Sequence, residues 1–256
     1  MDLLHVVIAV VTGLVLGSFY NVVIYRLPRR LSPLAPRSFC PSCERTLEAR
    51  DLVPLLSYVV LGGRCRFCKS RISVAYPLVE AGTALGFAVL AARSGLGWEW
   101  AFYALFFSLL VMISAIDLSH RVIPNVLTGS GVLGGAALLL ASGGAPLSLQ
   151  SAGLGLLVGG GTMLVIVLLS FGGMGAGDMK MAALMGFYLG WPGVAVALFA
   201  SFCIGALVGL MLIILRIKGR KDAIPFGPFL ALGSLIALFW AEPLIDWYLG
   251  YLYLAP

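Results

Sequence analysis

"LLHVVIAVVTGLVLGSFYNVVIY", residues 3–25, is a predominantly apolar run, and its length decides the fold class. About 20 such residues are enough for an α-helix to cross a bilayer. The run continues directly into "RLPRR" (26–30), without the small-residue cleavage site that ends a secretory signal. We therefore expect a retained first transmembrane helix over residues 3–25.

The rest of the chain has the same apolar character. Of its 256 residues, 61% are hydrophobic and 11% are charged, whereas about 25% charged residues are typical of soluble domains. The alternating segments of outer-membrane barrels are absent. We predict an all-α polytopic membrane protein with about eight transmembrane helices, the sixth short enough to be a half-helix. The expected spans lie near residues 3–25, 76–92, 98–116, 124–141, 151–170, 179–190, 193–215 and 228–249.

The formal net charge of +6 indicates membrane topology and is no nucleic-acid signal. Lysine and arginine gather on the cytoplasmic side of membrane proteins. With eight crossings and both termini outside, all of the 17 lysines and arginines except Arg93 fall inside. The partners expected from composition are therefore the lipid bilayer and no nucleic acid.

Residues 26–75 form the one soluble-looking segment, a cytoplasmic insertion that carries four of the five cysteines. "CPSC" (40–43) and "CRFC" (65–68) are separated by 21 residues, a spacing typical of zinc ribbons. A segment this small gains stability from a metal. We predict a structural zinc site with four ligands and no open coordination position, formed by Cys40, Cys43, Cys65 and Cys68.

Other interpretations of the cysteines are weaker. A reducing cytoplasm argues against two disulfides, and no βαβ pattern supports a thioredoxin-like redox pair. Four unrelated thiols remain an alternative. Cys203 lies in an apolar run, where we expect it to pack in a helix core.

Two aspartates lie at ends of apolar spans on the same predicted membrane face. Asp117 ends the third span in "SAIDLSHRVIPN", and Asp178 follows the fifth in "GGMGAGDMK" (172–180). Acids at such positions usually serve function. Paired carboxylates share a proton, so the ionised member takes a proton from water while the protonated member polarises a peptide carbonyl. The alternative for each aspartate is a helix cap.

Residues around the aspartates suit a peptide substrate. Gly172, Gly173, Gly175 and Gly177 allow close approach of an extended backbone. Basic side chains nearby, His120, Arg121 and Lys180, can tune the carboxylates or anchor the chain at lipid phosphates. "IPFGPF" (224–229) is either a turn before the last helix or a wall of the substrate groove.

Taken together and in order, these motifs resemble the bacterial type IV prepilin leader peptidases, membrane aspartic proteases of the GxGD type that also N-methylate pilins. The resemblance covers nearly the whole chain. Asn125 stands where many members have aspartate, and we assign it no proton role. The matching stretches are "GSFYNVVIYRLP" (17–28), "CPSC", "ARDLVPLLSYVVLGGRC" (49–65), "CRFC", "YPLVE" (76–80), "DLSHRVIPN" (117–125), "GMGAGDMK" (173–180) and "IPFGPFLALG" (224–233).

The resemblance implies an enzyme of the bacterial inner membrane that acts on the cytoplasmic side. It would cleave type IV prepilins or type II secretion pseudopilins after the glycine that ends a basic leader. It would then methylate the new N-terminal residue, usually phenylalanine, with S-adenosylmethionine as methyl donor. Asp117 and Asp178 match the catalytic pair, and the four cysteines match the metal site.

The methyl-transfer site is harder to locate, because no GxGxxG follows a strand. By resemblance it lies in the insertion and its neighbours. Glu80, inside the start of an apolar span, is expected to receive the pilin amine or to touch the cofactor, with Arg71 and Tyr76 as weaker candidates. The alternative is that Glu80 pairs with Arg71 or another basic neighbour. The expected domains are helix 1–25, insertion 26–75 and peptidase bundle 76–256.

Three other functions compete with this one. A presenilin-like protease would cut within transmembrane segments, but has no need for a cysteine tetrad. A peptidase-only relative would lack methylation. A transporter or assembly scaffold would use Asp117 and Asp178 as ion sites, and internal inverted repeats, which would support it, are not evident.

Overall fold

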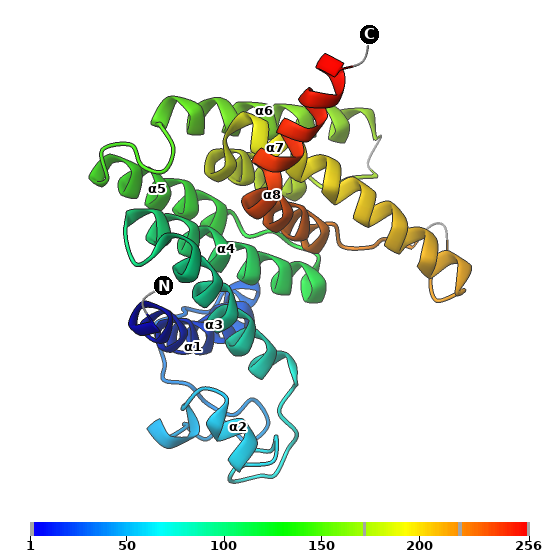
Figure 1. Ribbon diagram of the computed structural model, residues 1–256. Helices are drawn as coiled ribbons and strands as arrows, with labels where there is room; N and C mark the ends of the chain where they lie inside the picture. Colours follow the sequence, from blue (N-terminus) through cyan, green and yellow to red (C-terminus); the bar gives the residue numbers. More distant parts are fainter. Residues whose placement is uncertain (1–2, 171–172, 220–221, 255–256) are drawn as a thin grey trace. The chain divides into compact units, whose positions relative to one another are not determined.

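The computed structural model describes residues 3–170, 173–219 and 222–254, and in these ranges it contains helices but no strand (Figure 1). The prediction of an all-α polytopic protein is confirmed, because six helices are long and apolar enough to cross a membrane. A seventh apolar helix, α5 (Asn125–Ala141), has 17 residues. The six are α1 (Leu3–Arg26), α3 (Ala75–Ser94), α4 (Trp98–His120), α6 (Leu149–Leu169), α7 (Ala176–Ile214) and α8 (Gly227–Leu254).

Helix α7 accounts for two of the eight expected spans. It has 39 residues and is broken at Gly190, where φ is 69° and ψ is 175°. A side chain at this φ would be strained, and Pro192 just beyond cannot donate a helical hydrogen bond. The expected spans 179–190 and 193–215 are therefore the two halves of one kinked helix.

The chain divides into two compact units, Met1–Met112 and Ile113–Pro256, and the division falls inside α4. The first unit contains α1, α3, the start of α4 and the insertion. The second contains the end of α4 and helices α5 to α8. Each unit is described by itself.

Small residues bring the helices of the first unit close together. A Cβ added at Gly13 would lie 2.6 Å from the Cα of Ala84, and one at Gly17 would lie 2.9 Å from the Cα of Glu80. Helices in lipid associate through such close backbone approach. As a result, α1 packs directly against the part of α3 that carries Glu80.

Close packing at glycines also brings the helices of the second unit together. Helices α6 and α7 lie side by side (Figure 1). A Cβ added at Gly155 of α6 would overlap the carbonyl group of Gly186 in the first half of α7. In α8, a Cβ at Gly233 would overlap Ser201 in the second half of α7. The hydroxyl of Tyr188 donates to the carbonyl of Gly131 at 2.7 Å and joins α7 to α5. Helix α7 is thus the central helix of this unit.

The expectation for Cys203 is wrong. This residue is exposed on the second half of α7. The same half of α7 packs on α8 through Ser201 and Gly233. An apolar side chain on a membrane helix can face lipid as favourably as it can face a protein core, so the apolar sequence around Cys203 does not distinguish the two.

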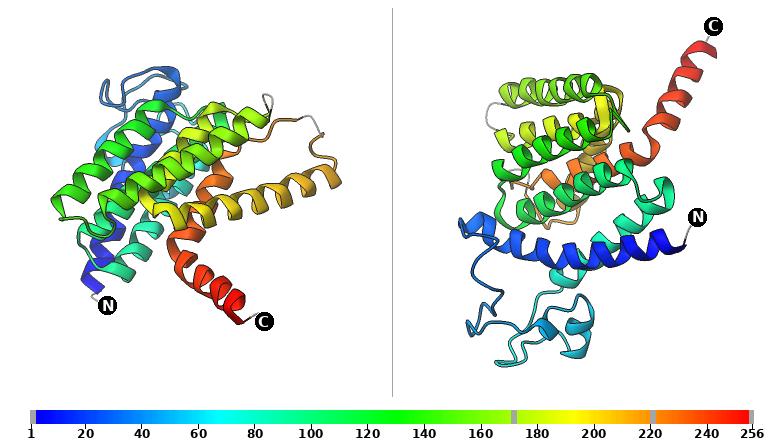
Figure 2. Two further views of the ribbon diagram at one scale, coloured as in Figure 1. Left: turned by 90° about the horizontal axis from the view of Figure 1, so that it is seen from above. Right: turned by 90° about the vertical axis from the view of Figure 1, so that its left-hand side faces the viewer.

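The insertion is a lobe of loops and short helices (Figure 2). Its elements are two 3₁₀ turns, η1 (Leu27–Arg29) and η2 (Ala49–Asp51), and the short helix α2 (Leu56–Val60). Its described residues also form two isolated antiparallel β-bridges, between Phe39 and Thr46 and between Arg64 and Arg71. So little regular structure leaves the shape of the lobe dependent on side-chain contacts.

Candidate functional site

Asp117 lies in the last turn of α4 and is 5% exposed. Its Oδ2 accepts the backbone N–H of Gly227, the first residue of α8, at 2.9 Å. Asp117 thus satisfies a backbone donor at the N-terminus of α8, so it caps a helix that is distant in sequence and is not the N-cap of α5 beside it in the chain. A buried carboxylate held by a backbone donor from a helix N-terminus keeps a fixed position.

Gly227 was missed as a functional residue by sequence reasoning. A Cβ added there would lie 2.7 Å from Oδ2 of Asp117, so only glycine fits beside the carboxylate. The stretch "IPFGPF" therefore contacts the candidate site. A glycine before a proline at the start of an apolar run signals a helix start, but nothing local connects it to a residue 110 positions earlier.

Asp178 is half-buried in the first turn of α7. The N-cap of this helix is Gly175, without a side-chain cap hydrogen bond. A Cβ at Gly177 would lie 3.2 Å from the Cβ of Ile123, and Nζ of Lys180 donates to Oδ1 of Asn125 at 2.8 Å. These contacts dock the start of α7 on the segment that follows Asp117.

Both carboxylates belong to the second unit, in which the start of α7 packs on the segment that follows Asp117. Arg121, with φ of 54°, donates its backbone N–H to the carbonyl of Asp117 at 2.8 Å. His120 is exposed. Gly173 and Gly175 are exposed beside Asp178, and Gly172 lies outside the described residues. Two carboxylates in one unit beside an open glycine turn can perform acid–base hydrolysis of a peptide.

The four cysteines of the insertion form two similar loops. In each, the first cysteine donates its N–H across a bridge, Cys40 to Arg45 at 3.0 Å and Cys65 to Ser70 at 2.9 Å. Each loop then turns through a residue with positive φ, Glu44 at 58° and Lys69 at 59°. Two such turns present two pairs of thiols to a common point.

The thiols fit a tetrahedral zinc ion. The Sγ atoms of Cys40, Cys43, Cys65 and Cys68 all lie within 4.8 Å of one another, and Cys40 and Cys68 are 3.8 Å apart. Zn–S bonds of about 2.3 Å put tetrahedral sulfurs about 3.8 Å apart. The hydroxyl of Ser70 lies 3.1 Å from Sγ of Cys68, where it can donate to the thiolate form that binds metal.

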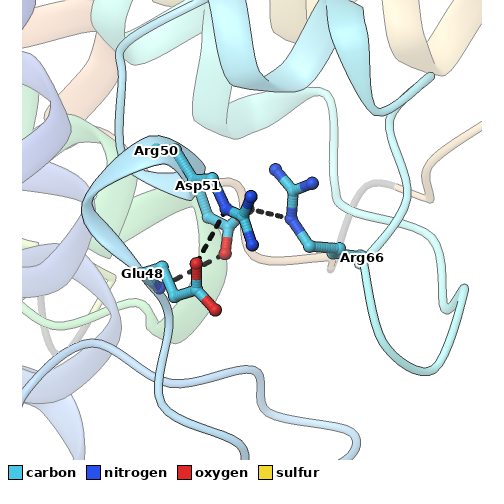
Figure 3. A network of polar contacts seen from close by, with 4 residues as sticks. All are labelled: Glu48, Arg50, Asp51 and Arg66. Atoms are coloured by element: carbon cyan, nitrogen blue, oxygen red, sulfur yellow. Dashed lines mark hydrogen bonds and ion pairs between the residues drawn. The ribbon is translucent and has the colours of Figure 1, made fainter.

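A buried ion pair joins the two parts of the insertion (Figure 3). Nε of Arg66 lies 2.6 Å from Oδ1 of Asp51, whose side chain is 2% exposed. Oδ2 of Asp51 also accepts the N–H of Glu48 at 3.2 Å. Burial raises the pKa of Asp51, but the bonds from Arg66 and Glu48 outweigh it and hold the pKa below its usual range. The nearby pair Arg50–Glu48 is exposed and contributes little.

Asp51→Asn is expected to destabilise the insertion by about 1–3 kcal/mol at pH 7, because Arg66 loses its charged partner. A depressed carboxyl pKa stabilises the fold above the unfolded value of about 4, and this contribution disappears as the pH falls through the folded value. Hydrogen exchange of residues 26–75 would show a difference between wild type and variant that shrinks in acid. Glu48→Gln is the control, with almost no effect, and a difference independent of pH would contradict the ion-pair explanation.

A cavity of about 370 Å³ lies between the insertion, the end of α1 and the start of α3. It contains all three residues proposed for the cofactor, Glu80, Arg71 and Tyr76, and the buried cysteines Cys40 and Cys65 line its wall. The first unit therefore brings the cysteine tetrad and the expected methyl-transfer residues to one place.

Glu80 is 8% exposed, and its Oε2 accepts the N–H of Leu55 at 2.8 Å. No basic side chain of residues 3–170, 173–219 or 222–254 forms an ion pair with it. The alternative that Glu80 pairs with Arg71 is therefore wrong.

Two family models match separate parts of the chain, one with the cysteine cluster and one with the two aspartates. Residues 11–94 match the Bacterial Peptidase A24 N-terminal domain, and residues 104–210 match the Type IV leader peptidase family. The first match contains the cysteine tetrad and Glu80, and the second contains Asp117 and Asp178. The second ends before Gly227.

Relatives are similar over almost the full length. A "Prepilin leader peptidase/N-methyltransferase" of Bacillus subtilis (strain 168) is 38% identical, covering 93% of this chain and 95% of the relative. Proteins of the same name from Aeromonas salmonicida (strain A449) and Legionella pneumophila are 36% and 34% identical. Each of these two alignments covers 93% of this chain; the first covers 91% of the Aeromonas protein and the second 92% of the Legionella protein. No solved structure matches the chain. The chain therefore belongs to the type IV leader peptidase family, in its prepilin leader peptidase/N-methyltransferase branch.

Proposed function

We propose that this protein cleaves the leader peptide from type IV prepilins and pseudopilins and then N-methylates the new N-terminal residue. The observation that carries the proposal is that the start of α7, which bears Asp178, packs on the segment that follows Asp117 within one helical unit of a membrane protein. We place the enzyme in the bacterial inner membrane, with both reactions on the cytoplasmic side, because the positive-inside distribution puts the insertion there.

In the proposed cleavage, the two aspartates share one proton. The ionised carboxylate takes a proton from water, whose oxygen attacks the scissile carbonyl carbon, while the protonated one donates a hydrogen bond to the carbonyl oxygen. The carbon–nitrogen bond then breaks, and the leaving amine takes a proton from the dyad. Gly227 holds one oxygen of Asp117 during this exchange.

The glycine turn divides its tasks. Gly175 is exposed, and the nearest side chain to a Cβ placed there is Asp178, at 3.8 Å. We assign it to the approach of the substrate backbone. Gly177 and Lys180, also expected at the substrate loop, contact Ile123 and Asn125 instead. We propose that these two position Asp178.

The methyl-transfer site is proposed in the cavity of the first unit. S-adenosylmethionine supplies the methyl group, and Glu80, Arg71 and Tyr76 line the space where it reacts. Cys40, Cys43, Cys65 and Cys68 hold a zinc ion that fixes the cavity wall and has no open position for catalysis. In this arrangement the insertion 26–75 serves methylation, and the helices after it carry the peptidase.

The proposal is tested with purified protein in proteoliposomes and a synthetic prepilin. Mass spectrometry should show release of the leader and, when S-adenosylmethionine is added, one methyl group on the new N-terminus. A pre-cleaved pilin should be methylated without cleavage. Absence of cleavage, with binding of cations that depends on Asp117 and Asp178, would favour the ion-site alternative instead.

Gly227→Ala is expected to lower the rate of cleavage by about 10²-fold, the cost of misplacing a catalytic group by about 1 Å. The added methyl group would lie 2.7 Å from Oδ2 of Asp117 and must displace the carboxylate. Initial rates of leader release measure the effect.

Gly129→Ala is the matched control for Gly227→Ala. Gly129 lies on α5, and a Cβ there would meet nothing within 4 Å. This variant should cleave as wild type does. If Gly227→Ala also cleaved at the wild-type rate, Gly227 would have no role in positioning Asp117.

A further inference from the structure

Glu80 is a buried carboxylate without a cation. It lies six residues into α3, a helix that is apolar enough to cross the membrane. Within the described part of the chain its polar contact is one neutral donor, the N–H of Leu55. Isolated buried charges are costly and normally have a partner. Arg26, Arg66 and Arg71 line the same cavity but form no ion pair with Glu80, so a cationic ligand there would meet an unpaired carboxylate.

The backbone at this point supports a functional role. Leu55 has φ of 59° and ψ of −47°, a conformation that L side chains rarely adopt. The hydrogen bond to Glu80 holds it there. Strain of this kind persists where the surrounding structure enforces it, often at ligand sites. One oxygen of Glu80 thus holds the backbone at Leu55, between the cavity-lining residues Leu52 and Ser57, and its other oxygen is left for a ligand.

The cavity separates two kinds of environment. Arg71 is exposed on the insertion side, where a water-soluble, carboxylate-bearing donor can approach. Glu80 is buried on α3, and the apolar and aromatic side chains that line the same cavity include Val22, Tyr25 and Tyr76, beside the polar Ser18 and Asn21. A cation attached to an apolar group would match both Glu80 and the apolar part of this lining.

We propose that Glu80 binds the α-amino group of an apolar N-terminal residue, so that it holds the methyl acceptor and not the methyl donor. The assignment rests on the proposed function for the reaction that follows binding. A protonated amine on a hydrophobic residue supplies both the charge that Glu80 lacks and the apolar surface that the cavity wall matches.

The chemical step balances with this arrangement. The α-amino group has a pKa of about 8 and arrives largely protonated, so it pairs with the carboxylate. After one proton has left to water, the nitrogen lone pair forms a bond to the methyl carbon of the sulfonium donor. The carbon–sulfur bond breaks with its electrons staying on sulfur. The products are a secondary ammonium group and a thioether.

Glu80→Gln tests the assignment, because the amide oxygen still accepts the N–H of Leu55 while the charge is removed. The probes are a fluorescent pilin peptide with a free N-terminus and the same peptide acetylated. Wild type should bind the free amine about 10- to 100-fold more tightly, as for a hydrogen bond between charged groups. Glu80→Gln should bind both peptides equally weakly, with an unchanged affinity for S-adenosylmethionine. In turnover, the KM for pre-cleaved pilin should rise.

Glu99→Gln is the charge control, since Glu99 is exposed on α4 of the same unit and does not line the cavity. If the Glu80→Gln variant still cleaves the leader peptide, it is folded. If the variant is not folded, the test is whether wild type binds the free amine more tightly than the acetylated peptide.

The outcomes separate the assignment from the proposed function. Equal binding of the two peptides by wild type would overturn the assignment, as would a loss of S-adenosylmethionine affinity in Glu80→Gln. A preference for the free amine that Glu80→Gln abolishes would support it even if wild type transferred no methyl group. In that case the assignment stands and the methyltransferase function fails.

Discussion

Asp117→Asn is expected to lower the rate of leader cleavage roughly 10²- to 10⁴-fold, the usual contribution of general acid–base catalysis. Asparagine keeps an oxygen that accepts the N–H of Gly227, so the bond that holds the side chain survives. It cannot accept the proton from water or return it to the leaving amine. Asp178→Asn should have an effect of similar size, because both members of the dyad exchange the proton.

The measurement separates the two activities. Initial rates of leader release are compared with rates of methylation of a pre-cleaved pilin by the same preparation. Methylation should be unchanged, because the cavity and the cysteine tetrad belong to the unit before residue 113. Asp246→Asn, an exposed aspartate on α8, is the control. Cleavage at the wild-type rate by either dyad variant would show that the paired-aspartate mechanism is wrong.

Helix positions could be predicted from sequence because lipid demands long apolar runs. The expected span 3–25 corresponds to Leu3–Arg26 and the span 151–170 to Leu149–Leu169. The end of α4 was expected at residue 116, but the helix continues to His120. One buried aspartate does not end a helix, and the positive φ of Arg121 does.

Contacts between distant segments could not be predicted in the same way. The CxxC spacing predicted a metal site because each pair is local. Gly227 meets Asp117, and Leu55 meets Glu80, only after the chain has folded. Glycine and leucine carry no polar side chain that signals these roles. Backbone donors that position a carboxylate leave no mark in composition or periodicity.

Removing the metal is the second change for which we expect a large effect, here on methylation alone. Cys65→Ser, or chelation of wild type, should abolish methylation of a pre-cleaved pilin and leave leader cleavage intact. Cys65 is buried and lines the cavity, and the two cysteine loops have little regular structure to hold them together without an ion. Structural zinc contributes directly to folding energy in such small modules.

Metal content by elemental analysis, together with the two separate rates, measures the effect of Cys65→Ser. Cys203→Ser is the matched control, because Cys203 is an exposed cysteine on α7 outside the tetrad. It should retain metal and both activities. Methylation that persists in metal-free protein would show that zinc does not maintain the cavity. Asp117, Asp178 and Gly227 lie in the other unit and contribute no ligand to the metal site. If cleavage nevertheless fell together with methylation as the metal was lost, the insertion would have to support the peptidase as well.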